Sequence, residues 1–417
     1  MNQTELTAGA LSETFFKRYT DDWKTLEPEQ FLDFLRAKID QCITFDELEK
    51  LIKSRHKLTI KFGIDPTGPD VHVGHLLPIF MLRQFQKAGH IIQLIIGDFT
   101  AMIGDPSGRD SGRSRLSKAD VQKNMRTYLK QIGPYLDIRK AKVHYNSEWL
   151  GKLSLAHIIA DFQQLSLTEI LQREDFRKRI EQGQGITLAE LIYSYAQGVD
   201  SVIITPDIEV GGRDQLLNFA HARTIMRARN QAPEVAVTTP VLKGTAGDGR
   251  KMSKSYNNYI AVRESAEEKF GKIMSIPDNL IVPYFTAFAD IKKSELQNLR
   301  LIAEHNPLEA KKQLGQFIVA IDEDSLKAGQ KEREKFEKKF SQKNLSGAKM
   351  PSLKIEGGET YFDAIVRSKL ITSKSELTRL FEQQAIHNTG TNATLQKSDL
   401  AAPGIIKIGK RLFLKLE

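Results

Sequence analysis

The 417-residue chain has little cysteine and no long apolar run. Its single cysteine, Cys42, excludes an internal disulfide framework and any zinc cluster built on cysteine. No apolar stretch approaches the roughly 20 residues that span a bilayer, and residues 1–5 lack the basic and then apolar pattern of a secretory signal. We therefore expect a cytoplasmic protein without a membrane-spanning segment.

Acidic residues are fewer than basic ones. The sequence has 52 Asp and Glu against 61 Lys and Arg, which gives a formal net charge of +9. This excess is typical of proteins with a polyanionic partner such as nucleic acid, but many basic proteins have no such partner, so the position of the charges matters more than their number. The length and a hydrophobic content of 40% are sufficient for a large core and predict two or three domains.

Two short motifs lie far apart in the sequence. His72-Val73-Gly74-His75 places two imidazoles three residues apart, on one face of a helix that would begin there, beside its positive N-terminal end. Residues 251–255, Lys-Met-Ser-Lys-Ser, follow a glycine-rich segment at 243–250 that could close over phosphates as a lid. Alone, the histidines could be surface residues or metal ligands, and the lysine motif could be a solvated loop. Together they predict the two halves of an ATP site.

The apolar pattern around the first motif predicts a crossover unit. Residues 58–64 have the pattern of a strand, 73–88 that of a helix closed by Gly89, and 91–96 that of a buried parallel strand. Strand, helix and strand in this order predict a doubly wound sheet with ligands at the C-terminal strand ends. The pattern also predicts one helix over residues 28–55, a surface loop over 105–118, mostly helices over 119–198, a strand over 201–204 and helices over 264–340.

The last 65 residues have the pattern of a separate α+β unit. Ser373 and Glu376 form a capping-box pattern that opens a short helix, and strand-like segments follow around residues 385–387, 405–406 and 412–414. The unit is rich in basic residues, namely Lys374, Arg379, Lys407, Lys410, Arg411 and Lys415. Such residues on one side of a small unit would suit RNA, although a plain α+β appendage remains an alternative.

The two motifs resemble the HIGH and KMSKS signatures of class I aminoacyl-tRNA synthetases. Residues 61–75, 96–108, 193–200 and 210–215 narrow the resemblance to bacterial tyrosyl-tRNA synthetases, and residues 353–417 resemble the RNA-binding domain named for ribosomal protein S-four. The resemblance implies an α/β protein with a Rossmann-like catalytic domain and connective insertion at 1–262, a helical tRNA-contacting domain at 263–345, a linker at 346–352 and the RNA-binding domain at 353–417. It implies activation of L-tyrosine with ATP and transfer of the tyrosyl group to tRNA(Tyr), by a homodimer that the insertion joins.

The resemblance also assigns roles to residues of the matched segments. It gives Thr67, His72, His75, Lys251 and Lys254 as catalytic; Asp65, Gly74, Asp214, Gln215, Met252, Ser253 and Ser255 as ATP-binding; Lys61, Thr100, Asp105, Tyr193, Gln197, Asp200 and Glu209 as tyrosine-binding; and Lys374, Arg379, Lys410 and Arg411 as tRNA-binding. ATP would enter as a substrate with Mg²⁺, with no tightly bound cofactor and no metal held by the protein. No side chain would act as a nucleophile.

Three residues depart from the pattern of one branch of this family. Lys61 stands where that branch has tyrosine, Glu209 where it has glutamine, and Arg213 where a small hydroxyl residue is usual. Lys61 could donate to the substrate phenol while pairing with Asp200, or it could point elsewhere.

Three other functions would each be consistent with part of the sequence. A synthetase for tryptophan is disfavoured by Asp200 and Gln197, because an indole has its donor at a different place. An inactive RNA-binding protein is disfavoured by the intact histidine and lysine motifs. A nucleotidyltransferase that shares only the histidine motif would not need residues 353–417.

Overall fold

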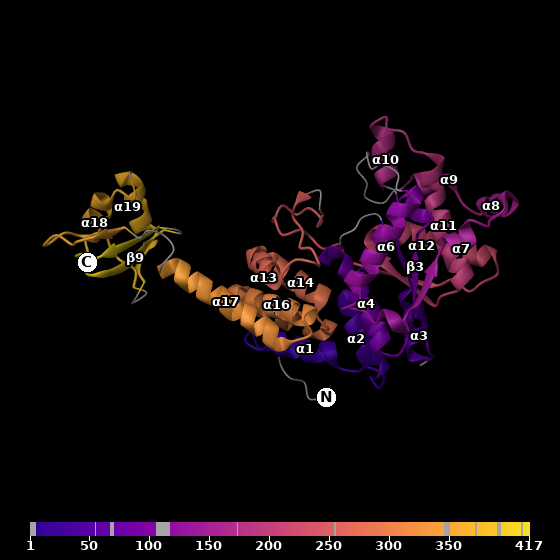
Figure 1. Cartoon of the computed structure of the whole chain (residues 1–417), viewed down its shortest axis with the longest axis horizontal. Helices are drawn as coiled ribbons and strands as arrows, with labels where there is room; N and C mark the ends of the chain where they lie inside the picture. The colour runs from indigo at the N-terminus through magenta and orange to yellow at the C-terminus, as the bar shows by residue number, and fades with distance from the viewer. Residues whose placement is uncertain are drawn as a thin grey trace. The chain divides into compact units, whose positions relative to one another are not determined.

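The computed structural model describes residues 6–54, 56–66, 71–105, 117–172, 174–253, 256–345, 351–371, 373–389, 393–409 and 412–417. The chain divides into two compact units, Met1–Arg333 and Glu334–Glu417 (Figure 1). In the described part of the chain, no helix combines the length and the apolar character needed to cross a bilayer.

The first unit is built on a six-stranded sheet. Its strands are β1 (Gln41–Ile43), β2 (Thr59–Ile64), β3 (Ile91–Ile96), β4 (Lys142–Tyr145), β5 (Ile208–Gly212) and β6 (Val235–Thr239), in the order β1-β6-β5-β2-β3-β4. All neighbours are parallel except β1, which pairs antiparallel with β6. Counted along the chain, the five parallel strands follow the order 3-2-1-4-5 found in Rossmann folds. The predicted doubly wound parallel sheet is therefore confirmed.

Helices cover both faces of this sheet. On one face, Ile60, Phe62 and Ile64 of β2 belong to the main core together with side chains of α4 (Leu76–Lys87), which packs on β3, β5 and β6. Successive side chains of a strand point to opposite faces, so Lys61 points the other way. There it contacts α11 (Leu188–Ile204), which packs against α12 (Leu216–Ala228). A charged residue thus reaches the interior from the middle of β2.

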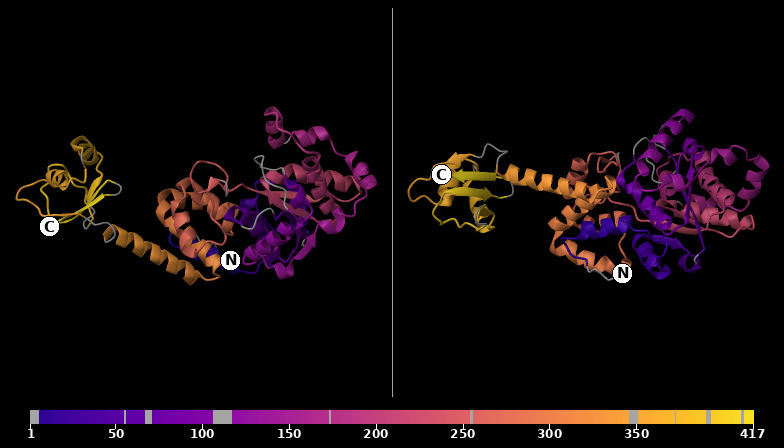
Figure 2. Two further views of the ribbon diagram at one scale, coloured as in Figure 1. Left: turned by 45° about the horizontal axis from the view of Figure 1, so that its top comes forward. Right: turned by 60° about the horizontal axis from the view of Figure 1, so that its bottom comes forward.

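The remaining helices surround the sheet or extend its core. They are α1 (Leu11–Thr20), α2 (Pro28–Lys38), α3 (Phe45–Lys53), α5 (Thr100–Ile103), α6 (Lys118–Ile132), α7 (Ser147–Leu150), α8 (Leu155–Phe162), α9 (Leu167–Leu171), α10 (Glu174–Glu181), α13 (Ala266–Ser275), α14 (Ile281–Phe288), α15 (Leu296–His305), α16 (Pro307–Asp322) and α17 (Leu326–Leu345). Figure 2 shows α1, at the indigo end of the chain, beside the orange helices, and α1 packs on α16. Buried side chains of α13, α14 and α16 share one core with the sheet.

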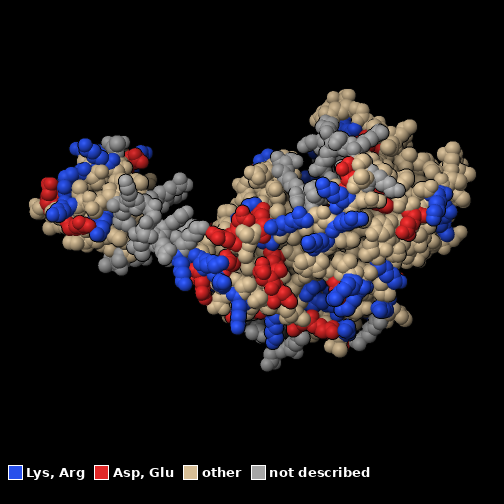
Figure 3. All heavy atoms as spheres, viewed as in Figure 1, with Lys and Arg blue, Asp and Glu red and all other residues tan. Residues whose placement is uncertain are grey.

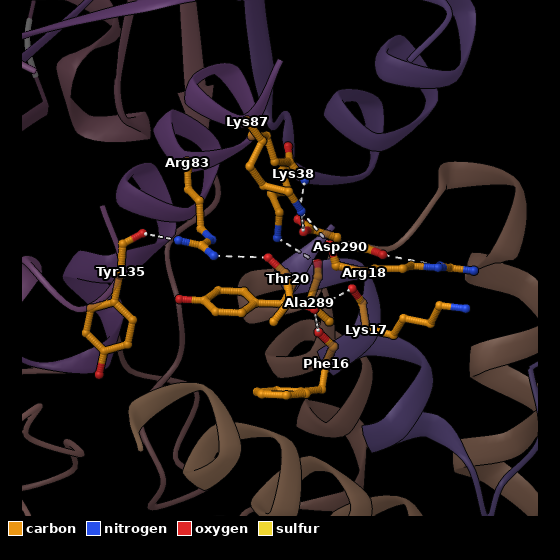
Figure 4. A network of polar contacts seen from close by, with 12 residues as sticks. Phe16, Lys17, Arg18, Thr20, Lys38, Arg83, Lys87, Tyr135, Ala289 and Asp290 are labelled. Carbon is orange, nitrogen blue, oxygen red and sulfur yellow. Dashed lines mark hydrogen bonds and ion pairs between the residues drawn. The ribbon is translucent and has the colours of Figure 1, made fainter. Parts of the chain in front are cut away.

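A buried polar cluster fastens the N-terminal helices to the end of α14 (Figure 4). Lys38 of α2 donates to the carbonyls of Thr286, Ala287 and Ala289, at 2.8, 3.1 and 2.9 Å. Next to it, Asp290 accepts from Lys87 of α4 at 2.9 Å. A cation at the C-terminal end of a helix satisfies carbonyls that have no partner within the helix, so Lys38 acts as a cap supplied from another element.

Two predicted elements were wrong. Residues 28–55 form α2 and α3 with β1 between them, because Cys42 pairs with Val237 of β6, a partner that no local pattern reveals. Residues 201–204 are not a strand but the last turn of α11, which ends where Thr205 adopts a positive φ of 42°. The stretch 119–198 is mostly helical, as predicted, and it also contains β4, whose half-buried edge position gives no continuous apolar run.

The second unit has its own small sheet and core. Strands β7 (Ser352–Leu353), β8 (Ile386–Asn388), β9 (Gly404–Ile408) and β10 (Leu412–Leu416) lie in the order β7-β10-β9-β8, with α18 (Tyr361–Ser368) and α19 (Lys374–Glu382) packed against them. The Ser373 hydroxyl accepts from the Glu376 amide at 3.3 Å and so caps α19. Buried Ile365, Leu377 and Ile406 hold the unit together without the first core.

Candidate active site

Polar residues gather where the strand order of the first sheet reverses, between β2 and β5. Asp65 follows β2 directly, Thr100 lies just after β3, and Asp214 follows β5. The C-terminal ends of parallel strands meet at one edge, and in open α/β sheets ligands bind at the reversal point. This edge is the candidate site.

Asp65 is the centre of one hydrogen-bond cluster at this edge. Its carboxylate accepts from the Thr100 hydroxyl at 2.7 Å and from the Tyr193 hydroxyl at 2.9 Å. Burial raises the pKa of Asp65 to about 7, although both hydrogen bonds act to lower it. A Cβ on Gly97 would lie 1.9 Å from the Asp65 carboxylate, so glycine is required there.

Asp200 is the centre of a second cluster, deeper in the protein. It accepts from the Trp149 indole at 2.8 Å and from the Asn146 amide at 3.3 Å, and Asn146 also donates to Thr100 at 3.0 Å. Burial raises the pKa of Asp200 to about 7, against the opposing effect of the positive charge on Lys61. The sequence analysis missed Asn146 and Trp149. Asn146 follows β4 directly, a position that would have marked it once that strand was recognised.

Helix α11 supplies three predicted tyrosine-binding residues from one face. Tyr193, Gln197 and Asp200 are spaced four and three residues apart, and all three are buried. This face looks onto β2, where the Lys61 ammonium lies 2.7 Å from Glu209 and donates to Ser201 at 2.6 Å. The sequence left open whether Lys61 pairs with Asp200 or points elsewhere. In the structure its ammonium is directed at Glu209, and it acts on Asp200 through its charge.

The turn after β5 carries the other predicted polar residues. Gln215, in the short 3₁₀ segment η3 (Arg213–Gln215), donates to Asp105 at 2.7 Å and accepts from Asn218 at 2.8 Å. These bonds join the end of β5 to the segment after α5. The Arg213 guanidinium lies 3.5 Å from the Asp40 carboxylate, and nothing else in the described part of the structure explains an arginine in this turn.

The first motif opens α4, as predicted. His72 precedes the 3₁₀ segment η1 (Val73–His75), and the His72 and His75 rings stack with their centroids 3.7 Å apart. A Cβ on Gly74 would lie 3.0 Å from the His72 ring and 3.6 Å from the Met252 sulfur. Thr67, predicted to be catalytic, lies outside the described residues.

The two motifs are brought together by the segment that follows the second one. Val73 donates its amide to the Ile260 carbonyl at 2.9 Å, and His72 forms a β-bridge with Ala261. Met252 is buried and faces Gly74. Lys254 and Ser255 lie outside the described residues, so the structure carries Lys251, Met252 and Ser253 of this motif.

Asn258, which the sequence analysis did not single out, shapes the glycine-rich loop. Its side chain accepts from the Ser253 amide at 2.8 Å and donates to the Lys251 carbonyl at 3.2 Å. A Cβ on Gly244 would lie 2.1 Å from the Asn258 amide nitrogen, so the loop closes around this asparagine only because residue 244 is glycine. Lys251 also forms a β-bridge with Lys243, which makes the candidate lid a two-stranded loop.

Sequence comparison decides the family. The profile described as "tRNA synthetases class I (W and Y)" matches residues 53–347. The chain is 37% identical to the tyrosine–tRNA ligase of Thermotoga maritima over 400 residues, which cover 94% of this chain and 98% of that protein. It is 39% identical to the tyrosine–tRNA ligase of Carboxydothermus hydrogenoformans over 407 residues, with the same coverage. The chain belongs to the tyrosyl-tRNA synthetases of bacterial type.

Solved structures agree on the fold. The truncated mitochondrial tyrosyl-tRNA synthetase of Aspergillus nidulans matches with a TM-score of 0.60 at 22% identity, over 79% of this chain and 98% of that one. The tyrosyl-tRNA synthetase of Archaeoglobus fulgidus, solved with L-tyrosine, matches with a TM-score of 0.59 at 21% identity, over 74% of this chain and the whole of that one.

Proposed function

We propose that this protein is a tyrosine–tRNA ligase, which activates L-tyrosine with ATP and then transfers the tyrosyl group to the 3′ end of tRNA(Tyr). The observation that carries the proposal is the meeting of the two motifs. The Val73 amide donates to the Ile260 carbonyl, and Met252 lies close to Gly74, in a unit whose sheet edge holds Asp65, hydrogen-bonded to Tyr193 of α11. Family membership and the relatives named as tyrosine–tRNA ligases support both the reaction and its amino-acid substrate.

Tyrosine would lie between α11 and the ends of β2 and β5. Asp105, Tyr193 and Gln197 are our candidates to bind its α-ammonium group, and Thr100 supports them through Asp65. Asp200 would accept the phenol hydroxyl, near Lys61 and Glu209. A site built to accept a hydroxyl rejects phenylalanine because its buried polar groups would be left without partners.

ATP would lie across the first motif, with the lid above it. Thr67, His72 and His75 would donate to the β- and γ-phosphates, Lys251 and Lys254 would neutralise them, and Gly74 leaves room for the nucleotide. Asp65, Asp214, Gln215, Met252, Ser253 and Ser255 would complete the nucleotide site. Mg²⁺ enters bound to ATP, and no tightly bound cofactor takes part.

The protein contributes positioning and charge stabilisation to the chemistry. A carboxylate oxygen of tyrosine attacks the α-phosphorus, the bond to the bridging oxygen breaks, and pyrophosphate leaves with its electron pair. Negative charge that builds on the phosphate oxygens is offset by the histidine and lysine donors. No covalent intermediate with the protein is needed.

Amino-acid-dependent exchange of pyrophosphate into ATP, run with each standard amino acid, tests the proposal. We expect tyrosine alone to support rapid exchange, and Asp200→Ala to lose most of the discrimination against phenylalanine. Equal rates with phenylalanine or tryptophan would overturn the assignment of tyrosine.

The lid assignment needs its own test, single-turnover adenylate formation by Lys254→Ala. We expect a much slower rate with little change in tyrosine affinity, because this lysine would act mainly on phosphate charge in the transition state. An unchanged rate would show that the lysine motif is an ordinary loop.

Recognition of tRNA is assigned to residues 263–345 and, beyond a linker at 346–352, to an S-four-type domain at 353–417. Lys374 and Arg379 are exposed on α19, whereas Lys410 and Arg411 lie outside the described residues. Basic and acidic side chains both occur on the visible face of the second unit (Figure 3), so individual basic residues rather than net charge would make the contacts.

We also propose that the protein is a cytoplasmic homodimer. Within the connective insertion, Leu155, Ile159 and Phe162 of α8 are exposed at 71%, 52% and 37% and share one helical face. An apolar helix face left in water is typical of a protein–protein interface, and a second copy of this chain is the partner that we assign to it.

A further inference from the structure

Behind the proposed tyrosine pocket lies a closed polar network that the sequence analysis did not foresee. Lys61 and Glu209 are register partners on the parallel strands β2 and β5, so their side chains emerge side by side. The ammonium nitrogen and Oε1 of Glu209 are 2.7 Å apart, and both side chains are inaccessible to solvent.

A second glutamate closes the network on its far side. The Ser201 hydroxyl accepts from Lys61 at 2.6 Å and donates to Oε1 of Glu234 at 2.9 Å. Glu234 directly precedes β6, the strand next to β5, and its side chain is buried at 1% exposure. Two carboxyl groups therefore share the environment of one ammonium group.

Only one of these carboxyl groups can be ionised without leaving an uncompensated buried charge. Oε2 of Glu209 and Oε2 of Glu234 are buried, and neither has a donor among the described side chains. Burial raises the pKa of Glu234 well above its usual range, and the negative charge of Glu209 raises it further. The Lys61 ammonium lies 2.7 Å from Glu209, so Glu209 is the carboxyl group that keeps the negative charge, and a proton on Glu234, directed at Glu209, would leave the network neutral overall.

The network reaches the substrate pocket through α11. Lys61 donates to the Gln197 carbonyl at 3.2 Å, and the Gln197 amide donates to Oε1 of Glu209 at 3.3 Å. Gln197 is thus fixed at both its backbone and its side chain, one turn before Asp200. The same bonds hold Lys61 on Glu209, so Asp200 keeps Asn146 and Trp149 as its hydrogen-bond donors.

We propose that Glu234, in its protonated form, is a positioning residue for the amino-acid pocket. It donates to Glu209 and accepts from Ser201, and thereby keeps Glu209 the carboxylate partner of Lys61. Gln197 is then held in place for the ammonium group, and Asp200 stays available to the phenol. The inference rests on the proposed function, because tyrosine is the ligand whose binding it affects.

Three variants of the full-length protein test the position of the proton. In Glu234→Gln the amide can donate to Glu209 and accept from Ser201, so we expect the KM for tyrosine in pyrophosphate exchange to stay within about twofold of wild type. Glu234→Met keeps the volume but removes both bonds, and we expect the KM for tyrosine to rise by about fivefold or more, with the KM for ATP unchanged. In Glu209→Gln, Lys61 loses its carboxylate and is drawn towards Asp200, so the same increase is expected.

The matched control is Gln313→Met, which removes a buried hydrogen-bonding side chain between α16 and α1, far along the chain from this network. It should lower the thermal midpoint while leaving the KM for tyrosine unchanged. Should Glu234→Met fail to fold, Ser201→Ala removes the bridging hydroxyl alone and is expected to raise the KM for tyrosine selectively.

The asymmetry between the two glutamine variants decides the inference. If Glu209→Gln left the KM for tyrosine unchanged and Glu234→Gln raised it, the proton would lie on Glu209, and the inference would be overturned. The inference would also be overturned if Glu234→Met, or Ser201→Ala in its place, had the same KM for tyrosine as the wild-type protein. Failure of the proposed function looks different, since the wild-type protein would then show no tyrosine-dependent exchange at all.

Discussion

At the scale of single residues, the site is dominated by carboxyl groups taken out of water. Asp65 and Asp200 each have a pKa raised to about 7, for which burial is the largest cause in both. Two hydrogen-bond donors stabilise the ionised form of each carboxyl group. The donors to Asp65 are Thr100 and Tyr193, and the donors to Asp200 are Asn146 and Trp149. These carboxyl groups therefore change their charge close to neutral pH, whereas exposed ones do so near pH 4.

We expect tyrosine binding to release protons near neutral pH. Tyr193, one of the candidates to bind the ammonium group, donates to Asp65 at 2.9 Å, so a bound ammonium would lie close to this carboxyl group and favour its ionised form. Binding therefore lowers the pKa of Asp65, and tyrosine affinity rises as the pH increases through about 7. Calorimetry at about pH 6.5 in two buffers of different ionisation enthalpy measures the release. At about pH 8 the carboxyl groups are already ionised and the release should vanish, which is the internal control. A binding enthalpy independent of the buffer at the lower pH would contradict the prediction.

At the scale of elements, the N-terminal segment is tied to the site-bearing sheet by the pairing of β1 with β6 and also by helix contacts. Lys38 illustrates this, because it joins α2 to the end of α14 while buried among carbonyl groups. Burial lowers its pKa from 10.5 to about 8, and the charge of Asp290 opposes that change only in part.

The lowered pKa of Lys38 makes stability depend on pH. Between about pH 8 and pH 10.5 the unfolded chain binds a proton at this lysine that the folded protein does not, so the free energy of unfolding rises with pH in this window, by at most about 3 kcal/mol. Both tryptophans, Trp23 and Trp149, lie in the first unit, so fluorescence-detected urea unfolding reports on it.

Lys38→Met should remove this contribution, so the stability difference between wild type and variant should widen from about pH 7.5 to pH 9.5. Lys38→Arg is the control, since arginine keeps its charge and donors throughout this range. A difference that stays constant with pH would show that Lys38 has an ordinary pKa in the folded protein.

The exposed face of α8 gives a second prediction at this scale. Ile159→Glu places a charge in the middle of the proposed dimer contact, where it would be buried without a partner, so we expect the sedimentation mass to fall from dimer to monomer. Leu308→Glu is the matched control, because Leu308 is equally exposed on α16, at 61%, outside the insertion. A wild-type protein that sediments as a monomer, or a dimer unaffected by Ile159→Glu, would refute the assignment.

At the scale of the whole molecule, activation and tRNA binding should be separable. The two units have separate cores, and the candidate active-site residues all belong to the first. In a protein ending at residue 346, the rate of tyrosine-dependent pyrophosphate exchange should stay within about twofold of that of the full-length protein. Aminoacylation of tRNA at limiting tRNA concentration should be at least about tenfold slower, because contacts with the tRNA phosphates are lost. Aminoacylation and exchange assays on the same preparations measure both. Equal charging by the two forms would leave residues 353–417 without a role in tRNA binding.

Salt dependence gives the control within the full-length protein. Lys374→Ala should reduce the slope of tRNA affinity against salt concentration by about one unit if Lys374 contacts a phosphate. An unchanged slope would remove Lys374 from the proposed interface.

The sequence by itself determined the features that local chemistry dictates. The strands at 58–64 and 91–96 and the helix between them follow from periodicity and turn residues that interact with near neighbours, and they place the candidate site at the C-terminal strand ends. The family followed from motifs such as His72 to His75 and residues 251–255, and the family profile and the relatives at 37% and 39% identity confirm it.

Only the tertiary structure decided which side chains share a partner. Asn146 and Trp149 meet Asp200, and Glu234 meets Ser201, across segments whose spacing carries no signal. The strand β1 exists because β6 offers it an edge, and β4 because β3 does. The direction of the Lys61 side chain could not be read from the sequence, because it depends on which carboxylate the neighbouring strand places beside it. In the structure that carboxylate belongs to Glu209 of β5.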